Sequence, residues 1–440
     1  MTADRRRIIL RLAWPIIGGM TSQNILNLID IAMVGRLGAA ALAGVGLAGF
    51  LNFMAVGAIM GLSAGVQATS ARRVGEGRDD ESAVPLNNGL LIALAAGLPL
   101  SILLWWFAPM IVATLVDDPA VVGEGTAYWQ GRLVGVVAIG ANFCFRGFWS
   151  GVGHTQVYLR TLVTTHILNV PISYCLIFGK LGLPELGALG AGIGTSLAVW
   201  IGTGIYLTVA WRHAQRRGFL HERGQPGDFA RLIRLALPNS LQQSLFAAGF
   251  AMLFWMIGQV GTPELAVSTV LINVMLVAIL PAIGFGLAAG TLAGQSLGRK
   301  DADDAQRWAW DVIRIGCLWL ALLGLPMCVV PRLLLGVFLD EAALVELGKI
   351  PLQLFGVGLI IDGAGIILMQ ALLGVGASRS VMFVAVGLQW LLFLPVVYVL
   401  GPILQYGLIA IWLAMFVWRG LQTGLFIWLW QRGGWRHSRV

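Results

Sequence analysis

Charged residues are scarce in this sequence. They make up 11% of its 440 residues, whereas soluble domains carry about 25%. Hydrophobic residues make up 58% of the chain, and its mean hydropathy is +0.82. The apolar segments are too long and too numerous for a secretory signal that precedes a soluble body. This composition excludes a soluble globular protein and predicts an integral membrane protein.

Cysteine is also rare. The chain has four cysteines, all of them inside apolar runs and none in a CxxC pair: Cys144, Cys175, Cys317 and Cys328. Such placement is typical of small core side chains and does not support a disulfide framework or a cysteine metal site. We therefore expect neither a structural disulfide nor a bound metal.

Motifs for enzymatic chemistry and nucleotide use are missing too. The chain has no DDxxD cluster to hold a magnesium-bound diphosphate, which argues against a prenyl-transferring membrane enzyme. It has no glycine-rich phosphate loop followed by Lys and Ser or Thr. The formal charge of +8 does not indicate nucleic acid, because the basic residues lie in short loops without interleaved aromatic residues. We expect a protein that is not an enzyme, needs no cofactor and binds no nucleic acid.

The sequence does contain twelve long apolar runs. A hydrocarbon core needs about 20 helical residues to cross, and only helices and closed barrels satisfy their backbone groups in lipid. Continuous runs, rather than short alternating ones, favour helices. We predict an all-α polytopic membrane protein with spans at residues 9–35, 43–68, 86–112, 121–146, 158–180, 187–211, 232–258, 266–292, 308–331, 347–372, 380–400 and 405–430.

The two halves of the chain resemble each other. The pattern Arg11-Leu12-Ala13-x-Pro15 recurs in the second half as Arg234-Leu235-Ala236-x-Pro238. The same shift of 223 residues, which we call the repeat shift, carries Gly151-Val152-Gly153 onto Gly374-Val375-Gly376. Parallel repeats of this kind build many transporters. We predict two six-helix lobes and a polar connection, namely an N lobe over residues 1–211, a cytoplasmic linker over 212–231 and a C lobe over 232–440.

The loop charges predict the orientation of the chain. One side receives most of the arginines, including Arg72, Arg73 and Arg299, and the opposite side receives acids such as Asp117 and Asp340. Loops rich in Arg and Lys stay on the cytoplasmic side of a membrane. Both termini are therefore expected in the cytoplasm.

Two acids, Asp30 and Asp362, lie inside predicted spans. A charge at mid-bilayer costs at least roughly 2.5 kcal/mol and is kept mainly where it has a function. We predict that each binds a proton or a cation. For Asp30 the alternative is a position near the interface or neutralisation by a neighbouring hydroxyl. For Asp362 it is a structural hydrogen bond to a neighbouring helix.

Uncharged polar residues accompany Asp30. Asn24, Asn27 and Asp30 are spaced by three, so they lie on or near one helix face. Such a face can hydrogen-bond the protonated acid or complete an oxygen shell around a small cation. A polar contact between helices is the alternative for each of them. Pro15 and Pro171, also inside spans, remove a backbone donor and can bend their helices.

Several of these segments resemble the multidrug and toxic compound extrusion (MATE) family of transporters over nearly the whole chain. They are Pro15 followed by LIDIAMVGRLG, the run RGFWSGVGHT after Tyr128, Asn169-Val170-Pro171, and GAGIGT ending at Thr195. The resemblance is greatest to the DinF-like branch. It implies that Asp30, Tyr128, Asn169 and Thr195 form a proton or cation site in the N lobe.

Two positions differ from the family patterns. DinF-like members often carry a second acid four residues after the asparagine, where this chain has Ser173. Asp362 resembles a C-lobe acid of the NorM-like branch, but the helix 7 glutamate of that branch is absent, with Phe246 nearest by spacing. We therefore expect one acid in each lobe. The predicted substrate contacts are Asn24, Asn27, Asn142 and Ser173.

The resemblance implies a secondary antiporter, in which inward movement of H+ or Na+ drives export of organic, often cationic, compounds. It also implies a multi-pass protein of the bacterial inner membrane, expected to be a monomer. One alternative is a flippase for lipid-linked precursors, which would need a cationic cavity; we expect no Arg or Lys at mid-span to build one. A non-transport membrane enzyme or a scaffold is the other.

Overall fold

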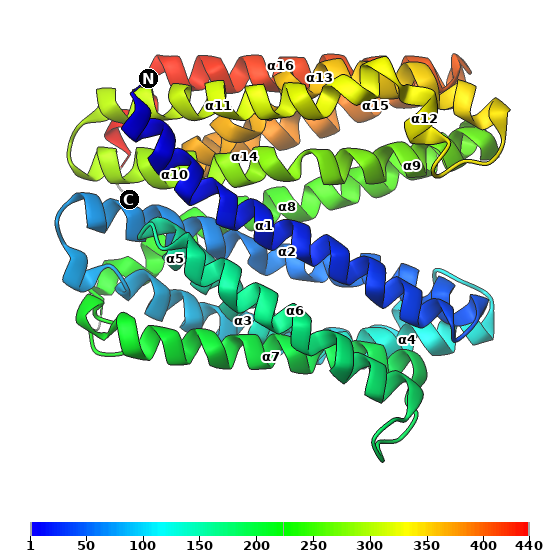
Figure 1. Ribbon diagram of the computed structural model, residues 1–440, viewed down its shortest axis with the longest axis horizontal. Helices are drawn as coiled ribbons and strands as arrows, with labels where there is room; N and C mark the ends of the chain where they lie inside the picture. The colour runs from blue at the N-terminus through cyan, green and yellow to red at the C-terminus, as the bar shows by residue number, and fades with distance from the viewer. Residues whose placement is uncertain (1, 223, 439–440) are drawn as a thin grey trace. The chain divides into compact units, whose positions relative to one another are not determined.

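The computed structural model of this protein is helical throughout, and no strand occurs in residues 2–222 and 224–438, which the structure describes. Residues 1, 223 and 439–440, which belong to the predicted N lobe, linker and C lobe, lie outside the described residues. The predicted all-α class is confirmed. Figure 1 shows long helices joined by short connections.

Seven long helices make up the first half of the chain, with short 3₁₀ turns at Asp79–Glu81 and Gln215–Arg217. The predicted span 121–146 is divided into two helices bent by 49°. The others are single helices that extend beyond the prediction at one or both ends, although the helix of the predicted span 158–180 already ends at Phe178. The helices are α1 (Ala3–Gly35), α2 (Ala39–Gly75), α3 (Val84–Ala113), α4 (Pro119–Leu133), α5 (Val136–Gly151), α6 (Thr155–Phe178) and α7 (Gly187–His213).

The second half repeats this pattern with two interruptions. The predicted span 266–292 contains a break after Ala278, where Pro281 at the start of the next helix supplies no backbone donor. The predicted span 380–400 alternates between α-helix and π-helix at Leu388–Phe393 and Val399–Ile403. The helices are α8 (Pro226–Val260), α9 (Thr262–Ala278), α10 (Leu280–Gly298), α11 (Ala302–Val329), α12 (Pro331–Leu335), α13 (Ala342–Gly374), α14 (Ser378–Gly387), α15 (Leu394–Tyr398) and α16 (Gly407–Arg432).

Length and hydropathy identify the membrane-spanning helices. Within the described residues, ten helical segments are long and apolar enough to cross a membrane, and the bent pair α4–α5 forms an eleventh span. The predicted twelfth, α1, has 33 residues and is not among those segments. Its polar residues Ser22, Gln23, Asn24, Asn27 and Asp30 lower its hydropathy. The chain is therefore a multi-span membrane protein.

The chain forms two compact units. The first unit is Gly18–Ser240, and the second unit is Met1–Ile17 together with Leu241–Val440. Helices α1 and α8 each pass from one unit to the other. The repeat shift carries Ile17, the last residue before one crossing, onto Ser240, the last before the other. These bounds differ from the predicted lobes, because residues 1–17 group with the second half and the predicted linker groups with the first.

Two glycines at equivalent positions of the repeat allow neighbouring helices to pack closely against α8 and α1, the helices that pass between the units. In the first unit, a Cβ added at Gly61 of α2 would lie 2.2 Å from the Ala236 carbonyl oxygen of α8, and the Gly61 N–H donates to Ser240 Oγ at 3.1 Å. In the second unit, a Cβ added at Gly284 of α10 would lie 2.4 Å from Ile17 of α1. The repeat shift carries Gly61 onto Gly284. The repeat thus extends to the packing of individual residues.

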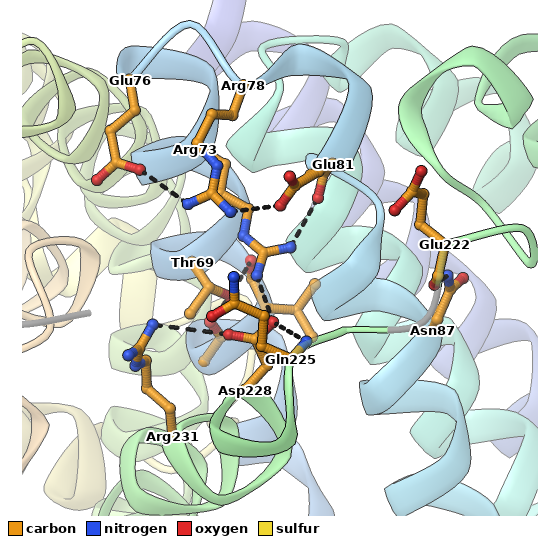
Figure 2. Close-up of polar contacts among 12 residues, drawn as sticks. Thr69, Arg73, Glu76, Arg78, Glu81, Asn87, Glu222, Gln225, Asp228 and Arg231 are labelled. Atoms are coloured by element: carbon orange, nitrogen blue, oxygen red, sulfur yellow. Dashed lines mark hydrogen bonds and ion pairs between the residues drawn. The ribbon is translucent and has the colours of Figure 1, made fainter.

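The predicted linker is bound to the first unit by a polar network (Figure 2). Arg73 of α2 donates to Asp228 Oδ2 at 2.7 Å and to the Glu81 carbonyl oxygen at 2.8 Å. Asn87 of α3 donates to the Gly218 carbonyl oxygen at 2.9 Å and accepts from the Leu220 N–H at 3.0 Å. The linker is therefore a folded part of this unit.

Candidate functional site

The glycines of α7 bring the predicted polar residues of the first unit close together. A Cβ added at Gly194 would lie 2.6 Å from Ser173 Oγ of α6, and one added at Gly192 would lie 2.3 Å from the Tyr128 carbonyl oxygen of α4. Only residues without a Cβ permit such approaches. Helix α7 therefore packs against both α4 and α6 (Figure 1), and Thr195 follows directly after Gly194 on this helix.

Two of these residues are hydrogen-bonded to each other. Asn169 is 1% exposed, and its Oδ1 accepts a hydrogen bond from Ser173 Oγ at 3.0 Å. Thr195 Oγ1 donates to the Ala191 carbonyl oxygen of its own helix at 2.9 Å. No hydrogen bond joins Asn169 or Thr195 to Asp30 in the part of the chain that the structure describes. These polar groups lie in the same unit as the acid without bonding to it.

Asp30 lies with Tyr128 and Arg132, two residues of α4. The carboxylate of Asp30 interacts electrostatically with both the Tyr128 hydroxyl and the Arg132 guanidinium. Its Oδ1 is buried and has no hydrogen-bond partner, and the Nε of Arg132 is likewise buried without one. We call these three residues the Asp30 cluster. An unbonded carboxylate oxygen is an available acceptor for a proton or a small cation.

The packing around the cluster is apolar. Met33 and Val34, one turn along α1 from Asp30, belong to a buried group with Ile177 of α6 and Ala191 of α7, against which Tyr128 also packs. Apolar neighbours of this kind make a charged carboxylate more costly than a neutralised one.

The predicted asparagines have different surroundings. Asn27 is exposed and accepts a hydrogen bond from Gln23 Nε2 at 3.1 Å on its own helix. Asn142 of α5 donates to the Val199 carbonyl oxygen at 3.3 Å and accepts from Thr203 Oγ1 at 2.9 Å, both on α7. No hydrogen bond joins Asn24 or Asn27 to Asp30 among the described residues. The hydrogen bonds of Asn142 are those of a structural contact between helices.

His166 of α6 is a polar residue that the sequence analysis missed. It is 6% exposed, and its two ring nitrogens lie 2.7 Å from Ser22 Oγ and 3.0 Å from Gln23 Oε1 of α1. Because a carboxamide oxygen only accepts, Nε2 donates to Gln23, and in the neutral ring Nδ1 accepts from Ser22. His166 thus holds α1 against α6 two turns before Asp30. A histidine inside a long apolar run was the signal.

The second acid has a partner in the second unit. Asp362 of α13 is 5% exposed, and its Oδ1 lies 3.4 Å from Arg419 Nη1 of α16. The expectation of no Arg or Lys at mid-span is wrong: Arg419 lies in the middle of α16, and Arg132 and Arg146 lie within α4 and α5. Arg419 is stabilised in place by Asp362, and Arg146 by a hydrogen bond of 3.1 Å to Ser63 Oγ. A lone Arg inside an apolar run was the available signal.

No group of His, Cys, Asp and Glu suited to a metal ion occurs among the described residues. The four cysteines are free thiols.

A protein-family comparison matches both halves of the chain. The family model MatE matches residues 15–175 and 238–399. The two matches start at Pro15 and Pro238, which the repeat shift carries onto each other.

Curated relatives are similar over almost their full length. A protein of a Synechococcus strain, described as a probable multidrug resistance protein NorM, is 26% identical over 95% of this chain and 92% of its own. A protein of the same description from Rhodopseudomonas palustris is 28% identical over 96% of this chain and 91% of its own.

Solved structures share the fold. A MOP superfamily transporter from Pyrococcus furiosus has a TM-score of 0.89 at 19% identity, covering 99% of this chain and 97% of that one. A eukaryotic MATE transporter has a TM-score of 0.86 at 18% identity, covering 98% and 97%.

Proposed function

Because this chain belongs to the MATE family of transporters, we propose that it is a secondary antiporter that exports organic, often cationic, compounds in exchange for H+ or Na+ moving inward. It is a transporter and not an enzyme. The observation that carries the mechanism is the buried Oδ1 of Asp30, which has no hydrogen-bond partner. The names of the curated relatives as multidrug resistance proteins support the substrate class.

The coupling step takes place at Asp30. When the carboxylate binds neither a proton nor a cation, Arg132 partly offsets its negative charge, and burial of that charge is costly. Binding of a proton or Na+ removes this cost and favours the conformation of α1 in which the acid is most buried. A ligand shifts a conformational equilibrium by its difference in affinity for the two states. Release of the ion restores the other conformation and completes one exchange.

Helix α1 is suited to transmit this change. Pro15 lies two residues before α1 passes from the second unit to the first, and Pro238 has the same position in α8. A proline inside a helix removes one backbone hydrogen bond and weakens the helix there. We infer that Pro15 is a bending point of α1, and that Pro171 has a similar part in α6, two residues after Asn169.

The remaining assignments follow from the proposed exchange. Substrate contacts are assigned to polar side chains of the first unit. The protein acts as a monomer in the bacterial inner membrane. Both of its termini lie in the cytoplasm. The N-terminal and C-terminal lobes move as alternating halves around the substrate. Tyr128, Asn169 and Thr195 assist Asp30 in ion binding. The substrate contacts are Asn24, Asn27, Asn142 and Ser173.

A second candidate is a flippase for lipid-linked precursors with anionic head groups. It is favoured by arginines inside membrane-spanning helices, such as Arg132, Arg146 and Arg419. However, Arg419 is paired with Asp362, and Arg132 interacts with Asp30, so these charges are offset rather than free. The antiporter therefore agrees better with the arrangement.

Drug resistance in cells tests the antiporter. Asp30→Asn keeps the size of the side chain and removes the charge, so resistance to an exported compound is expected to fall to the level of cells that lack the transporter. Asp117→Asn, at an exposed loop acid, is the control and keeps wild-type resistance. Wild-type resistance in Asp30→Asn cells at matched expression would contradict the mechanism.

A further inference from the structure

Asp362, the second acid, is paired with a positively charged side chain of the protein itself. Arg419 Nη1 lies 3.4 Å from Asp362 Oδ1, and the exposed fractions of the two side chains are 13% and 8%. No other Arg, Lys or His forms an ion pair with Asp362 in the described residues. The Arg419 Nε is buried without a hydrogen-bond partner, so the guanidinium is held mainly by this carboxylate.

Helix packing forces the two charges together. A Cβ added at Gly358 of α13 would lie 2.9 Å from the Phe416 ring of α16, and one added at Gly365 would lie 2.2 Å from Thr423 Oγ1. Thr423 Oγ1 also donates to the Ile361 carbonyl oxygen at 3.0 Å. These contacts lie on either side of the pair and fix the register of the two helices. Asp362 and Arg419 therefore stay close to each other as long as α13 and α16 remain packed.

Aromatic rings complete the surroundings of the guanidinium. Arg419 lies 4.6 Å from the Trp418 ring centre and 5.8 Å from that of Phe246 on α8. A cavity of about 30 Å³ borders the pair and is lined by apolar side chains such as Met275, Trp412 and Met415. Ring faces stabilise a guanidinium in a dry site. The cavity is small and has room for only a few water molecules.

We propose that Arg419 is the resident counter-ion of Asp362, so that the second unit carries a built-in cation in place of a coupling ion. An inorganic cation and a guanidinium both carry positive charge, so a cation bound at this carboxylate would lie close to the guanidinium in a buried site, where like charges repel strongly. Ion coupling therefore falls to Asp30 in the first unit. This inference rests on the proposed antiporter, and it predicts which acid does not take the coupling ion.

Equilibrium binding of radioactive Na+ to purified protein in detergent at alkaline pH tests the pair without any gradient or substrate. Arg419→Met frees the carboxylate and is expected to bind one more Na+ per chain than the wild type. Asp362→Asn/Arg419→Met is expected to return to the wild-type number. Arg432→Met, an exposed arginine at the end of the same helix, is the control and binds as the wild type does.

The outcomes separate this inference from the antiporter itself. If Arg419→Met gains no Na+, or if Asp362→Asn alone lowers the number bound by the wild type, Arg419 is not the resident counter-ion. In liposomes, the folded Asp362→Asn/Arg419→Met protein is expected to keep the driving ion of the wild type. Loss of ion coupling in that variant also overturns the inference. Failure of wild-type antiport, by contrast, concerns only the proposed function.

Discussion

Two asparagines of the first unit have opposite surroundings. Asn142 bonds to the main chain of α7 and to Thr203, whereas Asn169 accepts a hydrogen bond from Ser173 in the next turn of its own helix. A hydrogen bond between helices contributes about 1 kcal/mol. Asn142→Ala should therefore lower the free energy of unfolding by about 1–2 kcal/mol. Because Asn142 is also a proposed substrate contact, the variant should have a weaker affinity for substrate while its export still depends on the ion gradient.

Asn169→Ala should have the reverse effect. Its own contact lies within one helix, so we expect a small change in thermal stability and a large loss of ion-driven export. Thermal unfolding in detergent and substrate flux, measured on both variants, check this pair of predictions. Equal losses of flux in the two variants would show that Asn169 has no special part in coupling.

At the residue scale, single charges in apolar surroundings could be recognised from the sequence, but their partners could not. Asp30 and Asp362 were found because an acid in a span is costly wherever it lies. Arg419 and Arg132 were overlooked, although the same argument applies to them. Their pairing with acids depends on how distant helices pack. The roles of Asn24 and Asn27 as substrate contacts stay predictions. Helical spacing shows which residues share a face, but whether that face borders the substrate path depends on how the helices pack.

At the scale of elements, the approach of α2 to α8 depends on a missing side chain. Gly61→Ala would place a methyl group 2.2 Å from the Ala236 carbonyl oxygen, and overpacking of this kind costs about 1–3 kcal/mol. A Cβ at Gly46 of the same helix meets nothing within 4 Å. Gly61→Ala should lower the thermal unfolding temperature, and Gly46→Ala should leave it unchanged or raise it slightly.

Measurement of the thermal unfolding temperature of Gly61→Ala and Gly46→Ala tests this prediction. If both behave alike, the contact between α2 and α8 is looser than the structure indicates.

The spans themselves followed from the length of the apolar runs, and all twelve predicted runs coincide with helical segments. The interruptions within these spans could not be predicted from run length. The bend between α4 and α5 has no proline, and it coincides with Gly135, where an added Cβ would lie 2.8 Å from Ser196 Oγ of α7. The π-helical turns after Gly387 are associated with bonds from Gln389 and Trp390 to carbonyl oxygens of α8. Both features depend on contacts between helices, which apolar run length does not encode.

At the scale of the whole molecule, the connection between the halves is fastened to the first unit. Arg73 and Asp228 have side-chain exposures of 8% and 11% and lie at the centre of the network in Figure 2. Removal of one partner of a buried pair costs about 3–5 kcal/mol. Arg73→Asp should strongly destabilise the protein, and the reversed pair Arg73→Asp/Asp228→Arg should recover part of the loss.

Arg78→Ala is the matched control, because Arg78 is 41% exposed and pairs with Glu76 and Glu81 at the surface. Exposed pairs contribute about 0–1 kcal/mol, so this variant should unfold close to the wild-type temperature. No recovery in the reversed pair would mean that the hydrogen bonds around Arg73, rather than its charge, hold the connection.

The internal repeat was visible in the sequence, and the structure extends it to the points where α1 and α8 change units. The crossing itself was not foreseen. Apolar runs indicate where helices lie but not which neighbours they contact, so the grouping of residues 1–17 with the second half could not be derived from them. The predicted lobe bounds stay a prediction.

The central claim is that ion movement through Asp30 drives export. The most direct measurement is substrate flux in liposomes under an imposed H+ or Na+ gradient, with wild type beside Asp30→Asn and Asp362→Asn/Arg419→Met. We predict that one of the two gradients drives flux in the wild type and in the double variant, and that neither does so in Asp30→Asn. Gradient-driven flux of wild-type size in folded Asp30→Asn protein would contradict the account.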